Sequence, residues 1–169
     1  MTGVETVPAN RPRQLLIGVG NPDRGDDGAG RRVAQTLAGE LPGDIEVLQL
    51  SGEAAELVSQ LQGAQAVILV DASSSGAPAG TVQRFDVVAE PLPRELFAVS
   101  THGVGVADAI ELARALGDLP AVCIVYAIEA KCFDAGEPLS APVTAALPEV
   151  AARVRAEFEQ LASRERCDA

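Results

Sequence analysis

Apolar runs alternate along the chain with stretches in which apolar residues recur at helical spacing. The runs that begin at Leu15, Ala66 and Ala121 are apolar throughout, which is typical of strands buried on both faces of a sheet. Between them, apolar residues three and four positions apart predict amphipathic helices. The pattern predicts strands at 15–19, 45–50, 66–70, 82–87 and 121–128, and helices at 28–38, 54–61, 103–116 and 142–162.

This alternation of strands and helices predicts an α/β fold. We expect a three-layer sandwich, in which an open twisted sheet of about five strands carries helices on both faces. The strand at 82–87 is expected at an edge, and Pro148 should kink the last helix or restart it. Because 169 residues suit one core and no linker divides them, we expect a single domain over 1–169, with a loose lead-in at 1–13.

Composition narrows the classes of protein that fit. Aromatic residues make up only 3% of the chain, so the core must be built from Ala, Val, Leu and Ile. The net charge of −11 opposes binding to nucleic acid or to an anionic membrane. No apolar run approaches the roughly 20 residues that span a bilayer, and the first residues lack a secretory signal. We therefore expect a cytoplasmic protein.

The three cysteines do not indicate disulfide bonds or a zinc site. Their number is odd, and the chain has no C-x-x-C motif, so a disulfide framework or a zinc knuckle is not expected. Cys123 lies inside an apolar run and is expected to be a small core residue. The neighbourhood of Cys132 leaves its role open, and Cys167 lies in a charged tail.

The most informative stretch is GVGNPDRGDDGAG at residues 18–30, which follows the first predicted strand. It turns through glycines and delivers two adjacent acids, Asp26 and Asp27, to the start of a predicted helix. Adjacent side chains point in different directions, so we expect the two acids to divide their roles. Asp26 could cap the helix while Asp27 only gains from the helix dipole, but we expect one capping acid and one acid that faces outward as a ligand.

Two further polar residues follow buried or apolar segments. Asp71 ends the most apolar strand, and His102, the single histidine, precedes a predicted helix. Asp71 also fits a cap for the Ser-rich loop that follows it, and a lone histidine is often a surface residue. Since functional groups of α/β sheets gather at the carboxyl ends of the strands, Asp27, Asp71 and the loop after Ile128 should share one edge. An imidazole with two carboxylates suits a divalent transition metal.

Other common motifs are missing. The glycines at 18 and 20 do not form G-x-G-x-x-G, because Asp23 takes the place of the third glycine. The chain also has neither a P-loop nor a G-x-S-x-G elbow. No cofactor-binding residues are expected.

The motif at 18–30 resembles the N-terminal signature of the nickel–iron hydrogenase maturation endopeptidases. The resemblance continues in the same order through three further stretches and spans about residues 14–160. These stretches are VILVDASSSG, STHGVGVADAIELARALG and AIEAKCFDAGEPLSAPVTAALPEV.

The resemblance implies a protease that removes a short C-terminal extension from the precursor of the hydrogenase large subunit, after nickel has been inserted. Asp27, Asp71 and His102 match the family's three metal-contacting positions and are our candidates for both catalysis and metal contact. The family has Glu or Asp at the first position. The Ni²⁺ would be supplied by the precursor, which is the expected partner, and the chain itself is expected to be a monomer.

Several readings stay open from the residues alone. One histidine and two carboxylates form an incomplete ligand set, suited to a metal shared with another protein. The metal could polarise the scissile carbonyl or activate water, or Asp27 or Asp71 could act as a general base. The same residues also fit a non-catalytic metal-binding or chaperone-like module for a hydrogenase precursor. A small-molecule hydrolase that uses the carboxylate cleft is a weaker third reading.

Overall fold

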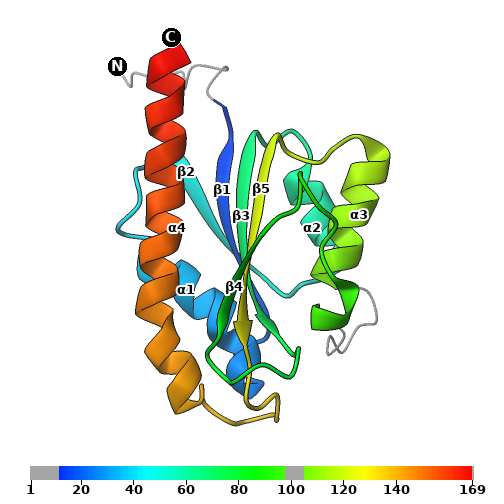
Figure 1. The fold of residues 1–169 in the computed structure, drawn as a ribbon, viewed down its shortest axis with the longest axis vertical. Coiled ribbons are helices and arrows are strands. Elements are labelled where there is room, and N and C mark those ends of the chain that lie inside the picture. The colour runs from blue at the N-terminus through cyan, green and yellow to red at the C-terminus, as the bar shows by residue number, and fades with distance from the viewer. Residues whose placement is uncertain (1–11, 98–104, 169) are drawn as a thin grey trace, which may run out of the picture.

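The computed structural model describes residues 12–97 and 105–168, which form one sheet covered by helices (Figure 1). The sheet order is β2-β1-β3-β5-β4. Four strands are parallel, and β4 lies at one edge, antiparallel to β5. The strands are β1 (Gln14–Val19), β2 (Ile45–Leu50), β3 (Ala66–Ser73), β4 (Val82–Asp86) and β5 (Val122–Glu129). The α-helices are α1 (Ala29–Leu37), α2 (Ala54–Leu61), α3 (Val106–Leu116) and α4 (Ala141–Asp168).

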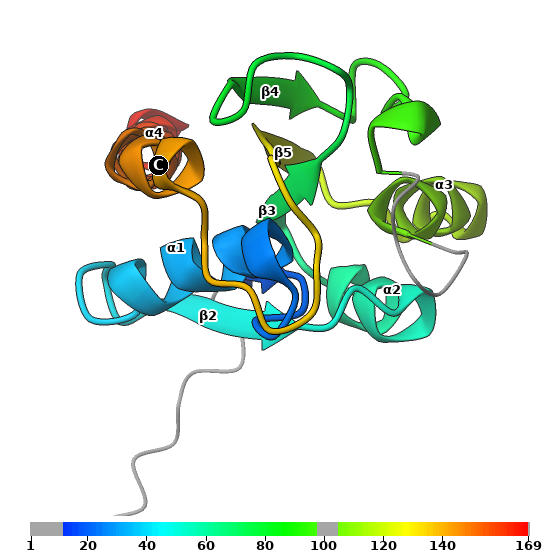
Figure 2. The ribbon, with the colours of Figure 1, turned by 90° about the horizontal axis from the view of Figure 1, so that it is seen from below.

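The helices form two layers on opposite faces of the sheet, as the sequence pattern predicts. Figure 2 shows α1 and α4 on one face, with α2 and α3 on the other. Alternate side chains of each buried strand enter the two cores. Leu15 and Ile17 of β1 pack in the α2/α3 layer, whereas Leu16 packs in the α1/α4 layer. The predicted α/β three-layer sandwich is therefore confirmed.

Small aliphatic side chains dominate both cores, as the composition implied. Cys123 is buried within the sheet, and this burial raises the pKa of its thiol to about 12. The cysteine is thus the inert core residue that was predicted. None of the helices in the described part of the chain combines the length and apolarity needed to cross a bilayer.

Two elements differ from the sequence prediction. β3 continues to Ser73, because β5 still pairs with it beyond Asp71. α4 runs without a break through Pro148 to Asp168, so the predicted restart at that proline is wrong. Pro148 and Thr144 are both exposed. The Thr144 carbonyl, which loses its usual helical donor at Pro148, can therefore bond to water instead.

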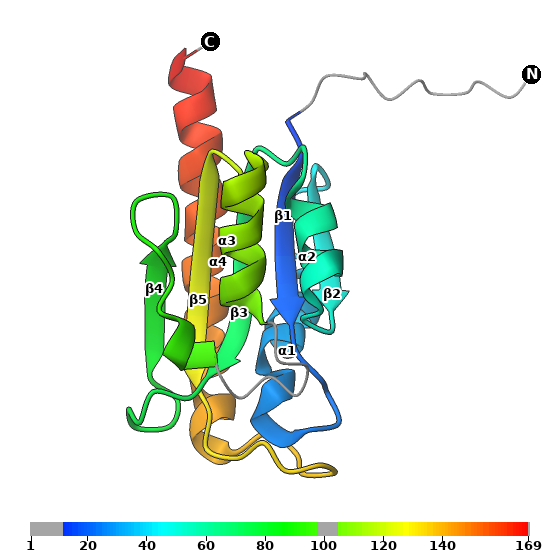
Figure 3. The same cartoon turned by 90° about the vertical axis from the view of Figure 1, so that its right-hand side faces the viewer.

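The first helix packs against the sheet through backbone contact. A Cβ atom at Gly30 would lie 2.1 Å from the carbonyl oxygen of Val70 and 2.6 Å from that of Val19. Only glycine allows this approach, which brings the start of α1 directly over β1 and β3. In Figure 3 the parallel strands point toward the end of the molecule at which α1 begins and β5 connects to α4. This edge is where the polar motifs meet.

Candidate functional site

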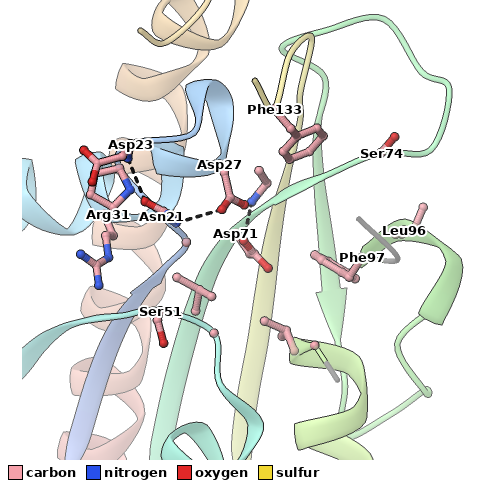
Figure 4. Close-up of a pocket in the computed structure, with 17 residues that line it drawn as sticks. Asn21, Asp23, Asp27, Arg31, Ser51, Asp71, Ser74, Leu96, Phe97 and Phe133 are labelled. Atoms are coloured by element: carbon pink, nitrogen blue, oxygen red, sulfur yellow. Dashed lines mark hydrogen bonds between the residues drawn. The ribbon is translucent and has the colours of Figure 1, made fainter. Parts of the chain in front are cut away.

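Asp27 lies in the single-turn 3-10 helix Gly25–Gly28, which joins β1 to α1. Its Oδ2 accepts a hydrogen bond of 2.9 Å from the Asn21 backbone N–H (Figure 4). Gly20 makes this turn possible: its φ is +135°, and a Cβ there would lie 1.8 Å from the Asp27 carbonyl oxygen. The glycine-rich motif thus folds back on itself and aims a half-buried carboxylate along the end of the sheet.

Asp71 lies on β3, one residue past the last position that pairs with β1. Its neighbour on the other side, Ala127 of β5, still pairs with it. The residue is 8% exposed, and its Oδ1 accepts a 2.8 Å bond from the N–H of Ala72. This bond goes to the next residue of the strand, so within the described residues Asp71 does not cap the Ser-rich loop.

The two carboxylates line one cleft of about 300 Å³ at the carboxyl edge of the sheet. Figure 4 shows Asp27 directed toward Asp71. Asn21, Asp23 and Arg31 lie on one side of the pair, and the apolar side chains of Leu96, Phe97 and Phe133 lie on the other. The predicted meeting of Asp27, Asp71 and the segment after Ile128 at one edge is confirmed, since Phe133 belongs to that segment.

Burial and mutual repulsion raise the pKa of both carboxyl groups. For Asp71 the larger cause is loss of hydration, followed by the negative charge of Asp27, and the pKa lies well above its usual range. The pKa of Asp27 is also raised by burial, although the Asn21 N–H and the charges of Arg24 and Arg31 oppose the shift. The cleft therefore disfavours the charged form of both carboxyl groups, and a cation placed between them would offset this cost.

His102, the third predicted site residue, lies outside the described residues. The two described positions that flank its segment, Phe97 and Gly105, both line the cleft. Within 12–97 and 105–168, no group of three or more His, Cys, Asp or Glu side chains is placed to hold a metal ion. Asp27 and Asp71 are the members of the predicted triad that the structure brings together.

The role of the Asp26 side chain differs from the prediction. It is fully buried, and the helix that follows shows no side-chain cap. Its carboxylate instead accepts four bonds of 2.7–3.2 Å, from the N–H groups of Lys131, Cys132 and Ser140 and from the Ser140 hydroxyl. The two adjacent acids do divide their roles, but Asp26 anchors the β5–α4 connection rather than capping a helix.

Glu129, which the sequence reasoning did not single out, organises the opposite loop. This buried residue ends β5 and accepts bonds of 2.8–3.2 Å from the Ser73 hydroxyl, from the backbone and hydroxyl of Ser75, and from the N–H of Gly76. The sequence did carry a signal for this contact. Glu129 is an acid at the end of an apolar run, and the chain also has a Ser-rich loop whose hydroxyl and N–H groups can donate to a carboxylate. Glu129 thus fixes the loop whose Ser74 lines the cleft.

Comparison with known proteins agrees with this geometry. The family model described as hydrogenase maturation protease matches residues 31–157. The chain belongs to this family. The match contains Asp71 and His102 and begins just after the turn that carries Asp27.

This maturation protease has relatives among the hydrogenase expression/formation proteins. HoxM of Azotobacter vinelandii is 30% identical over 152 residues, which cover 87% of this chain and 72% of HoxM. HupD of Thiocapsa roseopersicina is 29% identical over 122 residues, which cover 70% of this chain and 54% of HupD. The chain therefore matches only about half the length of HupD.

The fold is that of a solved family structure. The hydrogenase maturating endopeptidase HybD from E. coli superposes with a TM-score of 0.72 at 25% identity, covering 88% of this chain and 93% of HybD. The open five-stranded mixed sheet with helices on both faces is therefore an architecture that this chain shares with HybD.

Proposed function

We propose that this chain is the endopeptidase that removes a C-terminal extension from the nickel-loaded large-subunit precursor of a nickel–iron hydrogenase. The observation that carries the proposal is the convergence of Asp27 and Asp71, from separate elements, on one cleft at the carboxyl edge of the sheet. Membership of the maturation protease family supplies the reaction class. The precursor, rather than a small molecule, is then the substrate.

In this proposal Asp27, Asp71 and His102 contact the nickel ion that the precursor carries. Carboxylate oxygens and an imidazole nitrogen are suitable donors for such an ion. Three donors leave coordination positions for ligands from the precursor itself. The ion is then part of the substrate, and recognition requires that it has already been inserted.

The reaction is hydrolysis of one peptide bond. Water adds to the scissile carbonyl, the C–N bond breaks, and the products are a new C-terminal carboxylate and the amino group of the released peptide. A carboxylate of the cleft accepts the proton of the attacking water, and the same proton is available to the leaving amine. The apolar side chains of Phe97 and Phe133 beside the carboxylates provide contacts for substrate side chains.

The test is incubation of the purified chain with the precursor, prepared with and without nickel, followed by mass spectrometry of the intact precursor. We expect trimming of the nickel-loaded form only, and its loss in Asp27→Asn, Asp71→Asn and His102→Ala. Asp44→Asn is the matched control, because this exposed acid precedes β2 at the opposite edge of the sheet. Its rate should equal that of the wild type.

Two results would contradict the proposal in different ways. Wild-type trimming rates in all three site variants would remove Asp27, Asp71 and His102 from the mechanism. Binding of the nickel-loaded precursor without any change in its mass would instead support the non-catalytic, chaperone-like function.

A further inference from the structure

Two adjoining depressions, of about 340 and 510 Å³, lie along α1 and the first half of α4. Both are lined by Arg32, Thr144 and Leu147, so they form one groove, called here the α1–α4 groove. The first depression also shares Pro22 and Arg31 with the carboxylate cleft. The groove is therefore a continuation of the cleft rim, on the face of the sheet that α1 and α4 cover (Figure 2).

The charge of this groove is opposite to that of the molecule. Its described lining contains three arginines, Arg31, Arg32 and Arg155, and no Asp or Glu, although the chain as a whole has a net charge of −11. The Nε of Arg31 donates to the Leu50 carbonyl, and Arg155 forms an ion pair with Glu40. The exposed guanidinium of Arg32 has no acidic partner within residues 12–97 and 105–168.

The groove also offers apolar contacts. Leu147, Pro148 and Ala151 line it together with the arginines. Cations and apolar surface together suit an extended polypeptide that carries acidic and apolar side chains.

We propose that the α1–α4 groove binds a segment of the precursor that flanks the cleavage site and carries acidic and apolar side chains. This inference rests on the proposed function and adds the surface that selects the substrate. Continuity with the cleft favours this occupant: a polypeptide whose scissile bond lies at Asp27 and Asp71, and which leaves the cleft past Arg31, enters the groove directly. Charge complementarity then favours acidic residues in that segment.

The experiment uses two exposed groove positions with matched controls. Arg32→Glu reverses the charge of the arginine that lacks an acidic partner among the described residues. Thr144→Trp places a bulky side chain at a position that lines both depressions. Arg166→Glu makes the same charge change near the far end of α4, and Ala145→Trp introduces the same indole at the next, exposed position, which does not line the groove. Trimming is measured over a range of nickel-loaded precursor concentrations, after circular dichroism has shown that each variant is folded.

For each groove variant we expect KM to rise about tenfold with kcat changed by less than about twofold, as for a contact remote from the bond that is cut. The controls should keep the wild-type KM. Added salt should raise the wild-type KM and affect Arg32→Glu less, because salt screens the arginine–carboxylate attraction. Binding of the precursor to an Asp71→Asn background should weaken with Arg32→Glu to the same extent.

The outcomes separate the two proposals. Normal trimming with wild-type KM in both groove variants would overturn the groove assignment and leave the peptidase assignment intact. A fall in kcat without a change in KM would also overturn it. Absence of trimming by the wild type would overturn the proposed function, and with it this inference.

Discussion

Replacing Asp71 by asparagine should make the folded protein more stable while abolishing trimming of the precursor. The side chain is 8% exposed, and among the described residues it accepts one hydrogen bond, from the N–H of Ala72. Burial and the charge of Asp27 raise its pKa well above the usual range. Each pKa unit of such a shift corresponds to about 1.4 kcal/mol of destabilisation of the folded protein when the group is charged. Asparagine keeps an oxygen for the Ala72 N–H and removes the charge.

Two opposing contributions set the expected size of the effect. Relief of desolvation and of repulsion from Asp27 stabilises the variant, whereas a neutral acceptor bonds to the Ala72 N–H more weakly than a carboxylate by about 1 kcal/mol. We expect a net gain of roughly 1–2 kcal/mol in the free energy of unfolding at pH 8, a size typical of replacements that relieve strain at functional sites.

The sign of the pH dependence follows from the raised pKa. Below the ordinary value of 3.8, Asp71 is protonated in both the folded and the unfolded protein. As the pH rises, the unfolded chain releases this proton first, so the wild type loses stability until the pH passes the pKa of the folded state. The difference between Asp71→Asn and the wild type should therefore be small at pH 4, grow with pH and then level off.

Urea unfolding at several pH values between 4 and 8 measures this difference, with Asp44→Asn as the control for removing an exposed acid. The reasoning fails if Asp71→Asn is less stable than the wild type at pH 8. It also fails if the stability difference does not change with pH, because burial of a charged group would then not be its cause.

Three further variants and one control test the contacts that position the site, and urea unfolding measures the stability of each. Asp26→Asn places an amide among four donors and should cost about 2–3 kcal/mol; faster amide exchange at 131–140 should accompany it, and unchanged stability would contradict its anchoring role. Gly30→Ala should cost about 3 kcal/mol by overpacking. Gly39→Ala, where a Cβ meets nothing within 4 Å, should instead stabilise by up to about 1 kcal/mol, so equal effects would refute the close-approach argument. Glu129→Gln should cost about 1–2 kcal/mol and slow trimming, because the Ser73–Gly76 loop loses an acceptor; trimming at the wild-type rate would show that this loop does not shape the cleft.

The fold could be predicted because short stretches of the sequence show which segments form strands and which form helices. The apolar runs of β1, β3 and β5 are buried on both faces, and the amphipathic helices between them leave little choice of layer arrangement. Asp27 and Asp71 could be assigned to one edge by the same reasoning, since each follows a parallel strand. The role of Asp26 could not, because its partners lie 105–114 residues away. Local sequence offered only the helix start beside it.

The three buried acids of the described chain differ in the number of hydrogen bonds that they accept from described residues. Asp26 and Glu129 each accept hydrogen bonds from four donor groups and hold the loops on either side of the cleft. Asp71, almost as deeply buried, accepts one bond from the residues that the structure describes, and it faces a second carboxylate across the cleft. A fully bonded buried acid is stable as it stands, whereas an acid with one donor and a like-charged neighbour is stabilised only when a cation or a proton arrives. If the substrate delivers a metal ion, as we propose, the charge of that ion would offset both the desolvation of Asp71 and its repulsion from Asp27.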